Sequence, residues 1–339
     1  MWVLGGRRGL IGLGAAAAAA LPVLLAGCSG GGSGLVPTTS VTFQTSTSPT
    51  ASTSSTPTAR PAGQAPLTGL SVTTQLALSR PVVGVAVAYV PGGSSVGLGA
   101  ADIVYQEFDR TGHTRLVAVY QSTEASSVGP VGATAPVDLR LLQLFRTPAY
   151  AFAGGPAGFV SQVKSPLVAP RSSASFPTLF RVGAGGLVTS TSTLRSSDRG
   201  APSPLSGVMT FGSAATPEPT GGPALHRLTI VVPDQVAEVF TWTGSAWAGP
   251  GGTRLANVIF QVVLYKSITP HKSPTVGSAQ VVGTGEATVI AGQHAAATIW
   301  ARAQPGLVTT YTIKNVPVGL VPGRTWVLLV PRGTRLEVS

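Results

Sequence analysis

One short stretch of this chain gathers side chains that could bind a ligand or transfer protons. Carboxylates exchange protons, an imidazole titrates near neutral pH and a guanidinium binds anions. In a shared pocket, their pKa values would shift as catalysis requires. The stretch predicts a ligand-binding pocket that contains Glu107, His113 and Arg115. Glu107 and Asp109 are the candidate catalytic carboxylates. The alternative is a solvated cross-strand ion pair between Arg115 and either carboxylate.

Two alternating segments would position these side chains. Residues 102–108 read DIVYQEF, residues 115–121 read RLVAVYQ, and the intervening DRTGHT is rich in turn residues. This pattern predicts an antiparallel hairpin. Glu107 and Asp109, two residues apart, would then share one face of the first strand. Arg115 would begin the returning strand opposite them.

The rest of the first half predicts helices packed on a sheet. The apolar run at 82–90 indicates a buried strand that ends at Pro91-Gly-Gly. Pro136 and Asp138 favour a helix start, because proline suits the first turn and an acidic group stabilises the N-terminus. The expected elements are a helix at 136–146, a strand at 149–153, and short helices at 156–163 and 190–196. We expect an N-terminal α+β domain over 67–215 with a mixed or antiparallel sheet.

The second half predicts strands with turn signals between them and no long helix. We therefore expect a mostly β domain over 216–339, barrel-like or sandwich-like, and an α+β fold class for the chain. The expected strands contain LTIVV, AEVFTW, NVIFQVVLYK, AQVVGTGEATVI, AATIWARA, VTTYTI and TWVLLVP.

Other short motifs carry little chemistry. Gly93-Ser-Ser-Val-Gly97 spells G-x-S-x-G, but a nucleophile elbow needs a helix after the turn, and a strand is expected there. Ser161-Gln-Val-Lys164 spells S-x-x-K without the partner motifs of that enzyme class. The four histidines are widely spaced, so neither a metal site nor a cofactor is expected. Arg302 and Arg324, near tryptophans, suggest stacking or glycan binding as alternatives.

The N-terminus predicts export and lipidation. Arg7 and Arg8 precede the apolar run GLIGLGAAAAAALPVLLA, which indicates a signal peptide over 1–27. Leu25-Ala-Gly-Cys28 matches a lipobox, in which the cysteine thiol receives diacylglycerol. Stable anchoring needs two acyl chains, and a diacylated Cys28 supplies them. The alternatives are a permanent transmembrane helix and a twin-arginine signal.

A disordered tether is expected after the cysteine. Residues 28–66 are rich in Ser, Thr, Gly and Pro and have one charge, Arg60. Such a segment cannot bury enough apolar surface to offset its ordering entropy. Cys28 is the only cysteine of the chain, so its acylation would leave the mature body without disulfides or cysteine ligands.

The charge balance does not favour nucleic-acid binding. The chain has 22 basic and 11 acidic residues, a net charge of +11, but charged residues make up only 10% of it. The arginines are scattered and form no basic stripe with interleaved aromatics. We therefore expect no nucleic-acid partner. A weak attraction to an anionic envelope surface is the simpler consequence of this charge.

Several segments resemble the YerB-like family of bacterial lipoproteins, whose two domains are of unknown function. The resemblance covers roughly 67–332. The matching segments are the lipobox, RPVVGV from Arg80, ADIVYQE from Ala101, TGHTR from Thr111, GPV at 129–131, AGG at 153–155, ANVIFQV from Ala256, VGTGEA from Val282, WAR from Trp300 and PGRTWVLLVP from Pro322.

This chain departs from the family pattern at polar positions. Two arginines follow Gly-Pro-Val in that pattern, whereas this chain has Gly132 and Ala135. A Pro-His-Asn usually precedes the segment near Leu187, whereas this chain has Gly185-Gly186. The family's acidic residue ahead of the Gly-His-Thr-Arg turn has Asp109 as a candidate here. If the missing groups line an anion pocket in relatives, most of it is lost here.

Together these features predict a lipid-anchored protein on the extracytoplasmic face of the cell membrane. We expect a binding or scaffold module whose partner is an envelope protein or a cell-wall polymer, and not an enzyme. One alternative is an envelope hydrolase or transferase that uses Glu107 or Asp109 on a cell-wall polymer. Another is a role in nucleic-acid uptake or repair, which would require salt-dependent DNA binding.

Overall fold

The computed structural model describes most of the chain beyond residue 62. The described ranges are 63–73, 78–89, 92–93, 95–108, 114–156, 168–183, 185–198, 207–268 and 276–339. Outside them lie the expected signal peptide, Cys28, most of the tether, nearly all of the short helix at 156–163, Asp109 and His113. No helix among the described residues combines the length and apolar character needed to cross a bilayer.

A twelve-stranded mixed sheet dominates the described fold. Its order is β17-β16-β15-β14-β12-β18-β2-β3-β1-β4-β5, and β13 pairs with β12. The strands are β1 (Val83–Ala88), β2 (Ile103–Phe108), β3 (Thr114–Tyr120), β4 (Ala149–Phe152), β5 (Ala169–Ser172), β12 (Asn257–Ile268), β13 (Val276–Gln280), β14 (Gly283–Ala291), β15 (His294–Arg302), β16 (Thr310–Ile313), β17 (Val316–Pro317) and β18 (Thr325–Pro331).

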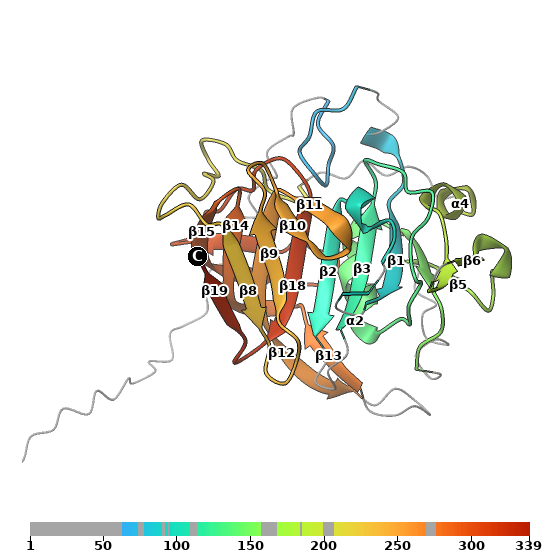
Figure 1. Ribbon diagram of the computed structural model, residues 1–339. Coiled ribbons are helices and arrows are strands. Elements are labelled where there is room, and N and C mark those ends of the chain that lie inside the picture. The colour runs from blue at the N-terminus through green and yellow to red at the C-terminus, as the bar shows by residue number, and fades with distance from the viewer. Residues whose placement is uncertain are drawn as a thin grey trace, which may run out of the picture. The chain divides into compact units, whose positions relative to one another are not determined.

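The expected hairpin is confirmed. β2 and β3 pair antiparallel, with Glu107 opposite Arg115. β3 also pairs antiparallel with β1, whose apolar run is buried from Val83 to Val87. β4 then adds parallel to β1. Figure 1 shows β2, β3 and β1 side by side in this order. The carboxyl ends of β1, β2 and β4 consequently lie on the same side of the sheet as the residue at which β3 begins.

Strands from the second half continue the same sheet. β18 pairs in parallel with β2, placing Trp326 beside Val104, and β12 pairs in parallel with β18. The other expected strands of this half are present, but AQVVGTGEATVI, which the sequence predicts as one strand, is divided between the end of β13 and β14. The α+β class is confirmed. Strands from both sides of residues 215 and 216 share this one sheet. The domain boundary expected there stays a prediction.

A second sheet covers part of one face of the large sheet and makes a sandwich. It has the order β11-β10-β9-β8-β19. Side chains of both sheets meet in one core, in which Phe240 packs edge-on against Trp326 at a centroid distance of 5.9 Å. Its strands are β8 (Arg227–Val231), β9 (Glu238–Trp242), β10 (Trp247–Gly249), β11 (Thr253–Leu255) and β19 (Arg335–Val338).

The opposite face of the large sheet carries α2 (Pro136–Leu142), which continues as a 3₁₀ turn, Gln143–Phe145. Val137, Leu141 and Leu142 of α2 are buried in a second core against side chains such as Val117 of β3. The helix ends earlier than the sequence predicts, because Arg146 and Thr147 have positive φ. A short helix α4 (Thr191–Ser196) confirms the one expected near 190–196, and β6 (Arg181–Gly183) pairs with β7 (Gly186–Val188) in a separate hairpin.

Candidate functional site

Arg115 lies between two buried carboxylates. Its Nη1 donates to Glu107 Oε2 at 2.8 Å, and its Nη2 contacts Asp138 Oδ2 at 2.6 Å. The exposed fractions of the side chains are 17% for Arg115, 5% for Glu107 and 0% for Asp138. The pairing of Arg115 with Glu107 is one that the sequence predicts. The alternative, a cross-strand ion pair, is therefore present, but it is largely buried and not solvated, because α2 packs over this face of the hairpin.

Asp138 holds its position through the start of α2. The backbone N–H of Ala135 donates to Asp138 Oδ2 at 2.7 Å, which satisfies an amide at the helix N-terminus. The hydroxyls of Tyr150 and Thr134 donate to the same oxygen. The carboxylate therefore connects α2, β4 and the loop at 134 to Arg115 at the start of β3.

Glu107 is held on both carboxylate oxygens. Its Oε1 accepts a hydrogen bond from the backbone N–H of Ala279 at 2.9 Å, and its Oε2 accepts from Arg115. Burial raises the pKa of Glu107, while Arg115 and the Ala279 amide act to lower it and Asp138 raises it further. The net direction is upward. Glu107 is thus a component of the packed interior that joins β2, β3 and β13.

The charges of this cluster are unequal, because two carboxylates share one guanidinium. Burial acts to lower the pKa of Arg115, but Asp138 and Glu107 outweigh it and raise that pKa above its usual value. Arg115 therefore stays charged. Burial, followed by the charge of Asp138, raises the pKa of Tyr150. The arrangement suits a structural role for Arg115 as a permanent cation that joins β2, β3 and α2. Its hydrogen bonds are already made to groups of the fold.

Two of the predicted site residues cannot be placed relative to this cluster. Asp109 and His113 lie outside the described residues. Ser95 is followed by a 3₁₀ turn, Leu98–Ala100, and then by β2. A nucleophile elbow would instead require an α-helix. Within the described ranges, no three His, Cys, Asp or Glu side chains converge as metal ligands would.

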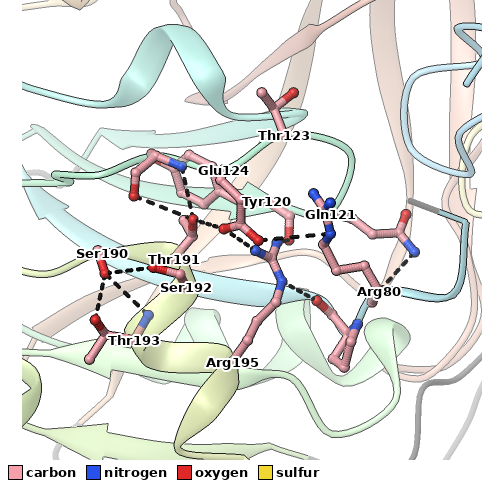
Figure 2. Close-up of polar contacts among 12 residues, drawn as sticks. Arg80, Tyr120, Gln121, Thr123, Glu124, Ser190, Thr191, Ser192, Thr193 and Arg195 are labelled. Atoms are coloured by element: carbon pink, nitrogen blue, oxygen red, sulfur yellow. Dashed lines mark hydrogen bonds and ion pairs between the residues drawn. The ribbon is translucent and has the colours of Figure 1, made fainter. Parts of the chain in front are cut away.

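A second ion-pair network lies where β3 ends. Figure 2 shows Arg195 of α4 directed at Glu124, which also accepts a hydrogen bond from Thr191. Arg80 approaches the same carboxylate, with 3.8 Å between its Nε and Glu124 Oε1. Arg195 also donates to the carbonyl oxygens of Pro81 at 2.9 Å and Tyr120 at 3.2 Å. These contacts connect α4 to the start of β1 and the end of β3.

Asp102 anchors the segment that follows β3. Its Oδ2 accepts from the backbone amides of Gln121 and Ser122 at 2.6 and 2.8 Å, and its Oδ1 accepts from the Ser122 hydroxyl. Burial raises the pKa of Asp102, and the bonds from Ser122 and Gln121 act against this rise. Asp102 is fully buried and holds a turn in place.

Asp138, Glu124 and Arg195 are missing from the predicted site. Asp138 carries a sequence signal, since an acidic residue in the first turn marks a helix start, but that signal does not reveal its partner. Glu124 and Arg195 are far apart in the chain and belong to no motif. Only the packing of α4 against β1 and β4 brings them together.

The glycines at three of the positions that differ from the family pattern have local structural roles in this chain. A Cβ placed on Gly132 would lie 2.6 Å from the backbone nitrogen of Ala88, so the chain leaves no space for a side chain there. Gly132 N–H donates to the carbonyl oxygen of Ala86 at 2.8 Å, which fixes this close approach. Gly185 and Gly186 turn the β6–β7 hairpin with φ of 85° and 139°, values that favour glycine.

Comparisons with known proteins agree with the fold. Residues 67–203 match a family described as the protein of unknown function (DUF3048) N-terminal domain, and residues 251–327 match the corresponding C-terminal domain. The crystal structure of YerB protein from Bacillus subtilis is similar, with a TM-score of 0.67 and 19% identity over 81% of this chain and 99% of that chain. No curated protein matches the chain. The chain therefore belongs to the YerB-like family, whose N-terminal and C-terminal domains are both of unknown function.

Proposed function

We propose that this protein is a lipid-anchored binding module on the extracytoplasmic face of the bacterial cell membrane. The lipobox Leu25-Ala-Gly-Cys28 behind an apolar leader supports the anchor. The main support for a binding function, rather than a catalytic one, is the geometry of Glu107. Both of its oxygens are occupied by groups of the fold, one by the Ala279 amide and one by Arg115. A general acid or base must instead reach a substrate proton.

The anchor is tested on the full-length protein expressed in a bacterium with a lipoprotein pathway. We expect mass spectrometry of its N-terminal peptide to show a chain that begins at Cys28 and carries acyl groups. The protein should then fractionate with membranes, and Cys28→Ala should lose the acyl groups. Ser33→Ala is the matched control and should keep them. An unmodified Cys28 with the leader still attached would refute the anchor.

The choice between binding and catalysis is tested with isolated cell walls. We expect the full-length protein to release no soluble fragments from them and to sediment with the envelope fraction that contains its partner. The rival proposal, a hydrolase or transferase that uses Glu107 or Asp109, predicts release that Glu107→Gln abolishes. Fragment release by the wild-type protein, lost in a Glu107→Gln variant that remains folded, would favour the enzyme.

A further inference from the structure

A shallow groove lies on the face of β12, β14, β15 and β16. Its volume is about 430 Å³, within the size range of small-ligand sites. Two rows of paired residues cross the strands. Phe260 lies opposite Thr288, and Thr288 opposite Ala297. Glu286 lies opposite Ile299, which in turn lies opposite Thr312. The short side chain of Ala297 leaves the hollow between these rows.

The groove has an apolar surface in contact with solvent. Phe260 and Val262 form part of the core that the five-stranded sheet covers, whereas Ala297 and Ile299 are exposed. The exposed fraction of Ile299 is 49%, and Leu264, farther along β12, is 48% exposed. Exposed apolar residues that gather at a hollow are more typical of a binding surface than single exposed ones.

An acidic and a basic side chain lie on opposite sides of the groove. Glu286 and Lys314 both line the groove and are both exposed, and among the described residues neither forms an ion pair. Lys314 has φ of 48° in the two-residue turn between β16 and β17. Asparagine or glycine is the usual residue at such a position, so a lysine there is uncommon.

The spacing of the two charges suggests the length of a ligand. Glu286 belongs to β14 and Lys314 follows β16, with β15 between them. Neighbouring strands are about 4.8 Å apart, and Lys314 lies two residues beyond Thr312, which is in line with Glu286, so these positions are separated by about 12 Å. An extended peptide advances about 3.3 Å per residue. Three to four residues therefore span the distance.

We propose that this groove binds a short extended peptide of about three to four residues that carries a free amine and a free carboxylate. Glu286 receives the ammonium group, Lys314 receives the carboxylate, and the apolar surface around Ala297 and Ile299 receives the side chains. This inference rests on the proposed binding function and names its ligand class. A phosphate ligand would be repelled by Glu286. A glycan would lack a stacking surface, because Phe260 is only 6% exposed.

The test is calorimetric titration of the full-length protein in detergent with the tripeptide Ala-Leu-Ala. We expect binding, and we expect N-acetyl-Ala-Leu-Ala-amide, which lacks both charges, to bind at least 5-fold more weakly. Glu286→Gln and Lys314→Gln should each weaken binding of the free tripeptide about 2- to 5-fold, as expected of exposed ion pairs. Glu337→Gln, on β19, is the matched control and should have no effect.

Two further variants locate the site. Ala297→Trp fills the hollow with an exposed side chain and should abolish binding while leaving the thermal transition in place. The charge exchange Glu286→Lys with Lys314→Glu should restore the affinity that Glu286→Lys alone removes, because the peptide can bind in the reverse direction. Equal affinity for the capped tripeptide, undiminished binding by Ala297→Trp, or binding of an N-acetylglucosamine oligomer alone would overturn the proposal. Peptide binding by a protein whose Cys28 is unmodified would support the groove and refute only the anchor.

Discussion

Tyr89 and Glu238 join the two sheets through a hydrogen bond between their buried side chains. The phenol of Tyr89, which follows β1, donates to Glu238 Oε2 on β9 at 3.1 Å. No cation among the described residues pairs with this carboxylate, which is 5% exposed. Burial raises the pKa of Glu238, and the bond from Tyr89 only partly opposes this. The same burial raises the pKa of Tyr89, so the phenol keeps its proton.

Glu238→Gln should therefore change how stability depends on pH. The folded-state pKa of Glu238 is raised, so its stabilising contribution is present below the unfolded pKa of about 4.3 and is lost as pH rises through the folded pKa. We expect the variant and the wild type to unfold alike near pH 4. The variant should gain about 1.4 kcal/mol at neutral pH for each unit of raised pKa. Urea unfolding at a series of pH values measures this, and a constant difference between the proteins would contradict it.

Arg115→Met should destabilise the protein strongly. The change leaves Glu107 and Asp138 buried without their cation, and breaking a buried pair costs about 3–5 kcal/mol. Arg335→Met is the matched control, because Arg335 and its partner Glu337 are exposed and such pairs contribute about 0–1 kcal/mol. Chemical unfolding followed by circular dichroism measures both. Similar losses for the two variants would show that the buried cluster does not stabilise the fold.

Gly132→Ala should destabilise the protein near the carboxyl ends of β1 and β4. The added Cβ would lie 2.6 Å from the backbone nitrogen of Ala88, and a backbone atom cannot move aside cheaply. We expect a loss of about 1–3 kcal/mol, as overpacking typically causes. Gly306→Ala is the control, because no atom lies within 4 Å of its new methyl group. Thermal unfolding compares the two, and an unchanged midpoint for Gly132→Ala would contradict the close approach.

Trp326→Phe should weaken the contact between β18 and β2. The indole N–H of Trp326 donates to Gln106 Oε1 at 2.7 Å, and both side chains are fully buried. The variant loses this bond and leaves the amide oxygen unsatisfied, which costs about 1–3 kcal/mol. Gln106→Leu combined with Trp326→Phe removes both partners and should recover part of the loss. Urea unfolding of the single and double variants tests this coupling, and additive losses would contradict it.

Local patterns were sufficient to predict most elements. Alternation on both sides of the segment DRTGHT, which is rich in turn residues, predicts the hairpin of β2 and β3, and the continuous apolar run at 82–90 predicts β1. Proline and an acidic residue at its start predict α2. These signals depend on residues within a few positions of one another, so they need no knowledge of the fold. The helix end was less predictable, because the positive φ of Arg146 and Thr147 leaves no mark in the pattern.

The sequence by itself determined most of the longer strands, the hairpin that brings Arg115 across from Glu107 or Asp109, and the expectation of a lipid anchor at Cys28. Tertiary structure alone decided that β18 joins β2 and that Asp138 completes the Arg115 cluster. It also decided that Glu107 is buried under α2 and β13. The reason is that side-chain periodicity reports which face of a strand is apolar, whereas partners distant in the chain are chosen by packing. Pairing between distant strands, and therefore the groove on β12–β16, depends on the whole core.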